Sequence, residues 1–502
     1  MWESKHSYGF LNLVIGKAFR IPLWFVVSAA VARLLGPEGL GQWSMLLAAG
    51  MLLNQLFLHW TQSMTLRFAY EHSAQGTVEN TFLLRLPILA FSFFLATLIL
   101  AGAPDLWLLS TFGINERASV LLALVAFWMM AETQSLQQVR ERFIALAWSP
   151  VLMDALLLVA VLIVAFWPGH EMGLFSSLQL RTVLLSVLCL GWIVLFLGEL
   201  RRSHFVGVSV RFSSLLPMVL FALPLVPGFL IAYFAEWSNY FLIRHFLGEF
   251  ELGLFHAGYQ YLIILIGIPT ALVSVLLPRL VMMYDKQGES FLAQFLTLQA
   301  PRLVFFWAIF VLIPLALLPW LFSWLLGPEF DSTARILMVL LIAVPGAMAQ
   351  HVYGMAYFLR GKLLLSTSFF FFVKLVIDFS LAWSLLPVVG VIASAWSVVV
   401  SYLVLQWCFL LFAQTGAGSR MRGVGVLCWC QACGVILFFA ETVPIRLMLA
   451  LALIFIGVLY LRRSGFLDAE ALRRVMPVSL KRYESFLLRL LCGSEASPKV
   501  NS

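Results

Sequence analysis

Long apolar stretches alternate with short polar segments along the whole of this chain. Most of these stretches have about 20 residues or more, the length of α-helix needed to cross roughly 30 Å of hydrocarbon. The pattern therefore predicts an all-α polytopic membrane protein with about fourteen transmembrane helices. The predicted spans lie near residues 12–34, 41–64, 81–103, 118–138, 147–167, 178–198, 215–243, 254–281, 300–326, 333–357, 363–386, 389–413, 424–440 and 445–461.

A short loop signature occurs twice, each time between two apolar stretches. Leu35-Gly36 is followed after three residues by Leu40-Gly41, and Leu247-Gly248 is followed after three residues by Leu252-Gly253. Internally repeated bundles are how many transporters build a site between two halves. The repeat predicts two six-helix lobes related by a pseudo-two-fold axis, at residues 1–212 and 213–415. An extra helix pair at 416–463 and an amphipathic cytoplasmic tail at 464–502 are expected to follow.

The composition and the distribution of charge agree with a membrane protein. Of the 502 residues, 62% are hydrophobic and only 11% are charged. Most of the 32 Lys and Arg residues fall in segments on the side of the amino terminus, whereas the opposite loops are richer in acids. The positive-inside rule then places both termini in the cytoplasm. This bias also explains the net charge of +8, so the charge does not indicate nucleic-acid binding.

The sequence offers no catalytic or metal-binding constellation. Cys428, Cys430 and Cys433 are close in sequence, but successive helical residues are rotated by about 100°, which spreads the three thiols around the helix. The loops between spans are too short to fold into a catalytic domain, and Gly-rich phosphate loops and nucleophile elbows are missing. We therefore predict no metal, no cofactor and no enzymatic activity.

Polar side chains inside the spans form stripes on equivalent faces of the two halves. Because charges inside a membrane are costly, each of them needs a partner or a water-filled cavity. The stripes predict one central cavity, lined by the first, second, seventh and eighth helices. The predicted substrate-binding residues on these helices are Lys17, Arg20, Gln55, His59, Gln62, Arg67, Glu236, Tyr240, Arg244, His256 and Gln260. The alternative for the basic residues of the first two helices is surface anchoring, and for Tyr240 it is ordinary packing.

The eleventh predicted span contains a second charged site. Lys374 and Asp378 are four residues apart within an apolar run, a spacing that allows them to form an ion pair on one helix face. Asp154 in the fifth span is the expected counterpart of Asp378 in the other half. Two interpretations stay open for the pair: a structural bridge, or a substrate contact by Lys374 in a wet cavity. Asp154, Glu236 and Asp378 are the predicted coupling or tuning residues.

The stretch from Ala32 to Trp43, with the sequence ARLLGPEGLGQW, resembles the first outer loop of the oligosaccharide flippases of the Wzx type. These belong to the multidrug/oligosaccharidyl-lipid/polysaccharide exporter superfamily, which also contains MATE transporters and lipid II flippases. The resemblance extends over nearly the whole chain and implies a MATE-like fold. It also implies a flippase of the bacterial cytoplasmic (inner) membrane that turns a polyprenyl-diphosphate-linked oligosaccharide toward the outer leaflet. A cationic cavity holding Lys17, Arg20, Arg67 and Lys374 agrees with such a substrate.

The resemblance leaves two rival functions open. A MATE antiporter is expected to carry an acid in its first helix, and none occurs between residues 4 and 37. The lipid II branch tends to concentrate arginines in its cavity, whereas Glu236 and Asp378 bring acids to this one. Membrane lipids are expected neighbours, and polysaccharide polymerase and chain-length machinery are the protein partners that the resemblance suggests. The sequence does not distinguish H⁺, Na⁺ or the membrane potential as the driving force.

Overall fold

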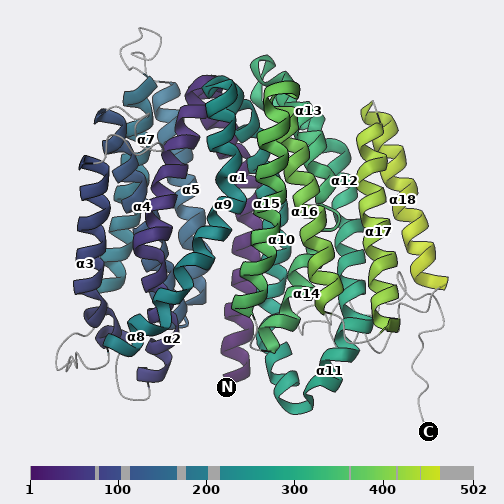
Figure 1. Ribbon diagram of the computed structural model, residues 1–502, viewed down its shortest axis with the longest axis horizontal. Coiled ribbons are helices and arrows are strands. Elements are labelled where there is room, and N and C mark those ends of the chain that lie inside the picture. The colour runs from purple at the N-terminus through teal and green to yellow at the C-terminus, as the bar shows by residue number, and fades with distance from the viewer. Residues whose placement is uncertain are drawn as a thin grey trace.

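The structure is a computed structural model that describes residues 2–73, 78–102, 114–166, 177–201, 215–360, 363–413, 417–440 and 442–463. Within these ranges every regular element is a helix, and the long helices run side by side between two ends of a bundle (Figure 1). The amino terminus lies at the lower end in Figure 1, which we call the amino-terminal end. The predicted tail at 464–502 lies outside the described residues.

Eleven helices in the described part of the chain are long and apolar enough to cross a membrane. The number rises to twelve if Pro328–Ala343 and Ala347–Leu359, bent by 41° relative to each other, form one span. One of the eleven, Phe19–Thr65, contains a kink at Gly36, and Val443–Leu459 is a shorter apolar helix. The polytopic all-α fold is therefore confirmed, while the number of fourteen spans stays a prediction.

The amino-terminal half begins with the long helix α1, which rises from the amino-terminal end, kinks at Gly36 and leads back through η1 to α2 at the bottom of Figure 1. Helix α1 packs against α5 and α4, and α4 packs against α7. The elements of this half are α1 (Trp2–Leu53), the π-helix η1 (Asn54–His59), α2 (Trp60–Ser73), α3 (Val78–Gly102), α4 (Ile114–Val139), α5 (Phe143–Ala165) and α7 (Ser177–Arg201).

The second half repeats the pairing of the first, since α9 packs against α15 as α1 packs against α5. Helices α17 and α18 form the outer edge on the right of Figure 1, where both contact α12. The elements are α8 (Leu215–Ala222), η3 (Leu223–Leu225), α9 (Val226–Leu247), α10 (Glu249–Gln287), α11 (Glu289–Gln294), η4 (Phe295–Gln299), α12 (Ala300–Leu326), η5 (Pro328–Phe330), α13 (Asp331–Leu340), η6 (Leu341–Ala343), α14 (Ala347–Leu359), α15 (Leu363–Val389), α16 (Ile392–Ala413), α17 (Ala417–Phe439) and α18 (Val443–Arg463).

The repeated loop signature has a structural reason at both of its glycines. The first glycine of each copy breaks the helix with a positive φ, 66° at Gly36 and 91° at Gly248, which glycine adopts without steric penalty. The second glycines meet each other across the two halves. A Cβ at Gly41 would clash with the Glu249 carbonyl, and a Cβ at Gly253 would clash with the Pro37 carbonyl.

This reciprocal contact brings the two halves together at the end of the bundle that holds both loops, which we call the glycine-turn end. Polar side chains reinforce the contact there. Glu249 accepts a hydrogen bond from Gln42 across the halves and pairs with Arg244, whose Nη2 lies 2.9 Å from Oε1. Arg181 donates in turn to the side-chain oxygen of Gln42. The two halves are therefore closed against each other at this end.

Candidate functional site

A cavity of about 260 Å³ lies among α1, α4, α5 and α7 of the amino-terminal half. Its wall is mostly apolar and aromatic, and its polar side chains are few, as in many ligand sites. Arg20, Ser28 and Asp154 come from the amino-terminal half, whereas Gln260 reaches the cavity from α10 of the other half. The aromatic lining residues are Trp24, Trp43, Phe127 and Trp192.

Arg20 is the accessible charge of this cavity. Its Nε lies 2.6 Å from Oδ2 of Asp154, and its Nη2 lies 3.5 Å from Oδ1. The Arg20 side chain is nevertheless 41% exposed, whereas that of Asp154 is 6% exposed. Trp24 lies beneath the guanidinium, 5.8 Å from its carbon to the ring centroid. Asp154 and Trp24 thus hold a guanidinium whose outer surface can still receive an anion.

The second half contains a buried charged cluster between α9, α15, α10 and α16. Its cation is Lys374, whose Nζ lies 3.6 Å from Oε1 of Glu236 and 4.0 Å from Oδ2 of Asp378. The same ammonium donates to the Ala235 carbonyl and lies 4.5 Å from the centroid of the Tyr402 ring. Two carboxylates, a carbonyl and an aromatic face therefore share one positive charge.

Hydrogen-bond donors from neighbouring helices hold the two carboxylates of this cluster. Tyr259 donates to Glu236 at 2.6 Å and Tyr402 donates to it at 2.9 Å. Asp378 accepts from Nδ2 of Asn239 at 2.9 Å and from the Ser397 hydroxyl at 2.7 Å. Each carboxylate keeps a fixed position through these bonds, which lowers the cost of burying it.

Of the two interpretations left open for Lys374, this conformation has the ion pair, because the Lys374 side chain is fully buried and faces no water-filled cavity. The expected pairing with Asp378 does occur, but the nearer carboxylate is Glu236 on another helix. The spacing within one helix could not reveal that partner. Lys374 therefore cannot contact substrate in this conformation.

A chain of polar side chains leads from α9 to the cavity in the other half. The Tyr240 hydroxyl lies 2.8 Å from Nδ1 of His256, and Nε2 of His256 contacts the side-chain nitrogen of Gln260. Tyr240 and His256 are buried, whereas Gln260 lines the cavity with Arg20. Three of the predicted site residues are thus brought together, and one of them, Gln260, lines the same cavity as a fourth, Arg20.

Four other predicted residues do not line this cavity: Gln55, His59, Gln62 and Arg244. Gln55 and His59 fall on the π-helix η1, and His59 packs edge-on against Phe229 at 4.7 Å between ring centroids. Oε1 of Gln55 and Nε2 of Gln62 are buried without a hydrogen-bond partner in the described residues. Arg244 belongs to the contact at the glycine-turn end. Lys17 and Arg67 lie on α1 and α2, and their side chains are outside the described part of the structure.

The hydroxyl and amide groups that hold the carboxylates are absent from the set of site residues predicted from the sequence. Tyr402 and Ser397 lie on α16, whose pattern predicts only an apolar span. A signal is present in that span, because Ser394, Ser397, Ser401 and Tyr402 recur on neighbouring turns among apolar residues. The sequence marks both Asp154 and Arg20 as charges within spans, but it does not predict that they pair with each other.

The fold of this chain is similar to the folds of several solved membrane proteins. The lipid II flippase MurJ in an inward closed conformation is 12% identical with a TM-score of 0.62, covering 91% of this chain and 100% of that one. A multidrug resistance MATE family transporter of the MOP superfamily, in an outward-facing conformation, is 15% identical with a TM-score of 0.55, covering 84% and 96%. A MOP superfamily transporter from Pyrococcus furiosus is 15% identical with a TM-score of 0.51, covering 84% and 96%.

The sequence itself identifies the family. The model of the polysaccharide biosynthesis protein family matches residues 8–284, and this chain belongs to that family. No curated protein sequence gave a significant match. The similar structures named above are those of a flippase and of transporters.

Proposed function

We propose that this protein is a flippase for a lipid-linked oligosaccharide. It would carry a polyprenyl diphosphate bearing a sugar repeat unit from the cytoplasmic to the outer leaflet of the bacterial cytoplasmic membrane, for assembly of a surface or secreted polysaccharide. The observation that carries the proposal is Arg20, a partly exposed guanidinium in an aromatic cavity to which both halves contribute. The family and the shared fold support it.

The chemistry of the cavity suits this class of substrate. A guanidinium binds phosphate oxygens through parallel N–H donors, so Arg20 can receive the diphosphate once it turns partly away from Asp154. Tryptophan faces and the Gln260 amide, which also line the cavity, are groups that bind sugar rings and hydroxyls. Lys17 and Arg67 would attract the anionic headgroup from the cytoplasmic side.

The closed glycine-turn end fits an alternating-access cycle. With the orientation expected from the basic residues, this end faces outward, so the structure corresponds to a state closed to the outside. Opening would separate Gly41 from Gly253 and release the Gln42–Glu249 contact. Asp154, Glu236 and Asp378 are the carboxylates available for coupling to H⁺ or Na⁺. A polysaccharide polymerase with its chain-length machinery would receive the product.

Deletion of the gene and substitution of Arg20 test the proposal together. We expect deletion to abolish the polysaccharide and to trap lipid-linked repeat units in the cytoplasmic leaflet. Arg20→Ala should reduce export per molecule of membrane protein at least about tenfold, since a charge-assisted contact to phosphate is lost, and Arg20→Lys should retain part of it. Export is normalised to abundance because Arg20→Ala also leaves Asp154 without its ion pair. Arg335→Ala, at an exposed arginine of α13, is the matched control.

Two outcomes would redirect the assignment. Normal polysaccharide with altered drug efflux in the deletion strain would favour a MATE-like antiporter. Loss of viability with trapped lipid II would favour a lipid II flippase. Full export by Arg20→Ala would remove the cavity from the substrate path, whatever the substrate is.

A further inference from the structure

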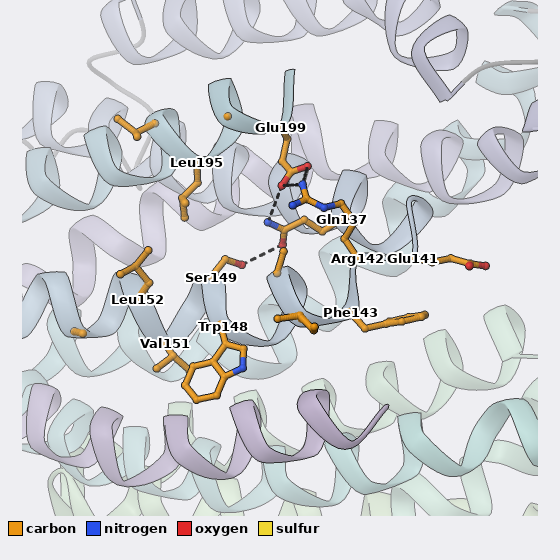
Figure 2. Close-up of a pocket in the computed structure, with 15 residues that line it drawn as sticks. Gln137, Glu141, Arg142, Phe143, Trp148, Ser149, Val151, Leu152, Leu195 and Glu199 are labelled. Carbon is orange, nitrogen blue, oxygen red and sulfur yellow. Dashed lines mark hydrogen bonds and ion pairs between the residues drawn. The ribbon is translucent and has the colours of Figure 1, made fainter. Parts of the chain in front are cut away.

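A larger cavity, of about 1000 Å³, lies outside the Arg20 site, along the surface of α5 and α7 (Figure 2). Its walls are apolar side chains of α5 and α7, including Ile144, Leu152 and Val194, which are 59%, 57% and 66% exposed. Both helices are candidate membrane spans. Apolar side chains this exposed on spanning helices face lipid tails, so the cavity is a groove that opens to the bilayer.

One end of this groove is strongly polar. Where α4 and α7 end and α5 begins, Nη1 of Arg142 lies 2.5 Å from both carboxylate oxygens of Glu199. Gln137 contacts Glu199 at 3.5 Å and accepts a hydrogen bond from Ser149 at 3.1 Å (Figure 2). Glu199 is 4% exposed and Arg142 is 33% exposed. Glu199 therefore fixes the guanidinium of Arg142 while leaving part of it open to the groove.

The neighbouring residue, Glu141, brings a negative charge to the same end. It is exposed, lines the groove and adopts a positive φ of 53°, unlike any other non-glycine residue that the structure describes. The bonds from Arg142 N to Gln137 O and from Glu141 N to Gln138 O form the helix C-cap in which glycine is the usual residue. A glutamate here holds a strained backbone, and such strain points to a role for its side chain.

We propose that this groove binds a phospholipid with an ethanolamine headgroup. Arg142 would receive the phosphate, and Glu141 would accept hydrogen bonds from the primary ammonium. The acyl chains would lie along the apolar wall formed by Trp148, Leu152 and Val194. This end of the groove carries two cations, Arg140 and Arg142, and two acids, Glu141 and Glu199, so a zwitterionic headgroup would leave its net charge unchanged.

The dimensions and the charges select this lipid over others in a bilayer. From Arg142 to Ala155 the groove follows α5 for about 20 Å, which suits an acyl chain that starts at the headgroup level. A choline headgroup carries no N–H to donate to Glu141, and an anionic headgroup would place its charge beside that carboxylate. Trp148 lies beside Val151 on α5 (Figure 2), about 9 Å along the helix from Arg142, where its indole ring can contact the part of the lipid next to the headgroup.

Lipid retention by the purified protein tests this site. Native mass spectrometry after exchange into detergent with equal amounts of phosphatidylethanolamine, phosphatidylcholine and phosphatidylglycerol should show phosphatidylethanolamine retained about tenfold more than the others, as expected for a charge-assisted hydrogen bond. Glu141→Gln should remove most of this preference. Arg142→Gln should weaken retention of all three lipids, while Arg140 still pairs with Glu199 at 3.6 Å.

Two further variants separate lipid binding from folding. Glu141→Gly suits the positive φ, so it should keep or raise the melting temperature while losing the lipid preference. Gly198 lines the groove and has open space around its Cβ position, so Gly198→Leu should block the acyl chains without a clash. Gly425, which is exposed on α17 and also has open space, provides the matched control Gly425→Leu. Glu329→Gln, at an exposed acid near the other end, is the control for Glu141→Gln.

Three results would overturn the proposal. Equal retention of the three lipids by the unmodified protein would remove the headgroup selectivity. Preference for phosphatidylglycerol would show an anionic site instead. Unchanged phosphatidylethanolamine retention in both Glu141→Gln and Gly198→Leu would place the lipid elsewhere on the protein.

Discussion

At the scale of single residues, Lys374 is the buried charge on which its surroundings depend most. It is the cation nearest to Glu236 and Asp378 in the described residues, and both carboxylates lie within 4.0 Å of its ammonium. Removing a cation from a buried cluster of this kind leaves uncompensated negative charge, which is more destabilising than removing one of two acids. Loss of the lysine should therefore destabilise the protein more than loss of either carboxylate.

We expect Lys374→Met to destabilise the protein by about 3–5 kcal/mol, the range found when one partner of a buried pair is removed. Glu236→Gln should cost about 1 kcal/mol or less, because Asp378 still balances Lys374 and the glutamine oxygen still accepts from Tyr259 and Tyr402. Thermal unfolding in detergent, together with abundance in the membrane, measures both effects. Lys286→Met, at an exposed lysine, is the control.

The exchanged pair Lys374→Asp with Asp378→Lys sharpens this test. The exchange moves the ammonium by about 6 Å along α15, away from Glu236 and Tyr402. If the position of the cation matters, the exchanged protein should accumulate as poorly as Lys374→Met. Full recovery of abundance would mean that the cluster needs only its net charge, contrary to the observed division of contacts between Glu236 and Asp378.

The sequence could identify the charges of the site but not their partners. Arg20, Asp154, Glu236 and Lys374 stand out because charged residues are rare inside apolar runs. Their partners lie on other helices, so pairing depends on helix packing that a single helix pattern does not contain. At η1 the i, i+3 and i+4 pattern also fails, because a π-helix turns by more residues than an α-helix. The predicted common face of Gln55, His59 and Gln62 rests on α-helical geometry.

At the scale of elements, the crossing of α1 and α10 at the glycine-turn end controls the contact between halves. We expect Gly41→Ala and Gly253→Ala each to open this end, since the added methyl group meets a carbonyl of the other half. The two effects should be similar, because each glycine packs on the loop of the other. The double variant should be less than additive, since both methyl groups break one contact. Spin labels at the exposed Glu38 and Asp331 would report the separation.

Gly267→Ala is the control for this experiment, because its Cβ position on the same helix α10 meets no atom within 4 Å. We expect the distance distribution of Gly267→Ala to match that of the unmodified protein. A distribution unchanged in Gly41→Ala and Gly253→Ala as well would show that the closed end tolerates the methyl groups. The close approach would then not restrict opening.

The helices themselves are predictable from the sequence for a physical reason. A segment that crosses a bilayer must satisfy its backbone hydrogen bonds internally, so a long apolar run specifies a helix almost by itself. The repeated signature also locates both helix breaks, at Gly36 and Gly248. The sequence does not reveal the mutual contact of Gly41 and Gly253, because a pair of equivalent small residues becomes informative only when the two halves are placed together.

At the scale of the whole molecule, each half has an ion pair between equivalent helices, but the acid and the cation have exchanged helices. On the pair α1 and α5 the cation comes from the first helix, as Arg20, and the acid from the second, as Asp154. On the equivalent pair α9 and α15 the acid Glu236 comes from the first helix and the cation Lys374 from the second. The first pair is open to a cavity and the second is buried. Under the proposed function, the first pair would contact the substrate, whereas the second pair stabilises the packing of its half.

The orientation of this asymmetric molecule in the membrane decides which leaflet each site meets. The excess of basic residues on the side of the amino terminus predicts that both termini face the cytoplasm and that the glycine-turn end faces outward. A cysteine at the exposed Ser332 of α13 should then react with a membrane-impermeant maleimide in intact spheroplasts. A cysteine at the exposed Gln287, at the end of α10, should react only after the membrane is permeabilised. The expected labelling pattern places the glycine-turn end outside and the polar end of the lipid groove, at Glu141, at the cytoplasmic surface. The reverse pattern would invert the topology and place the polar end of the groove in the outer leaflet.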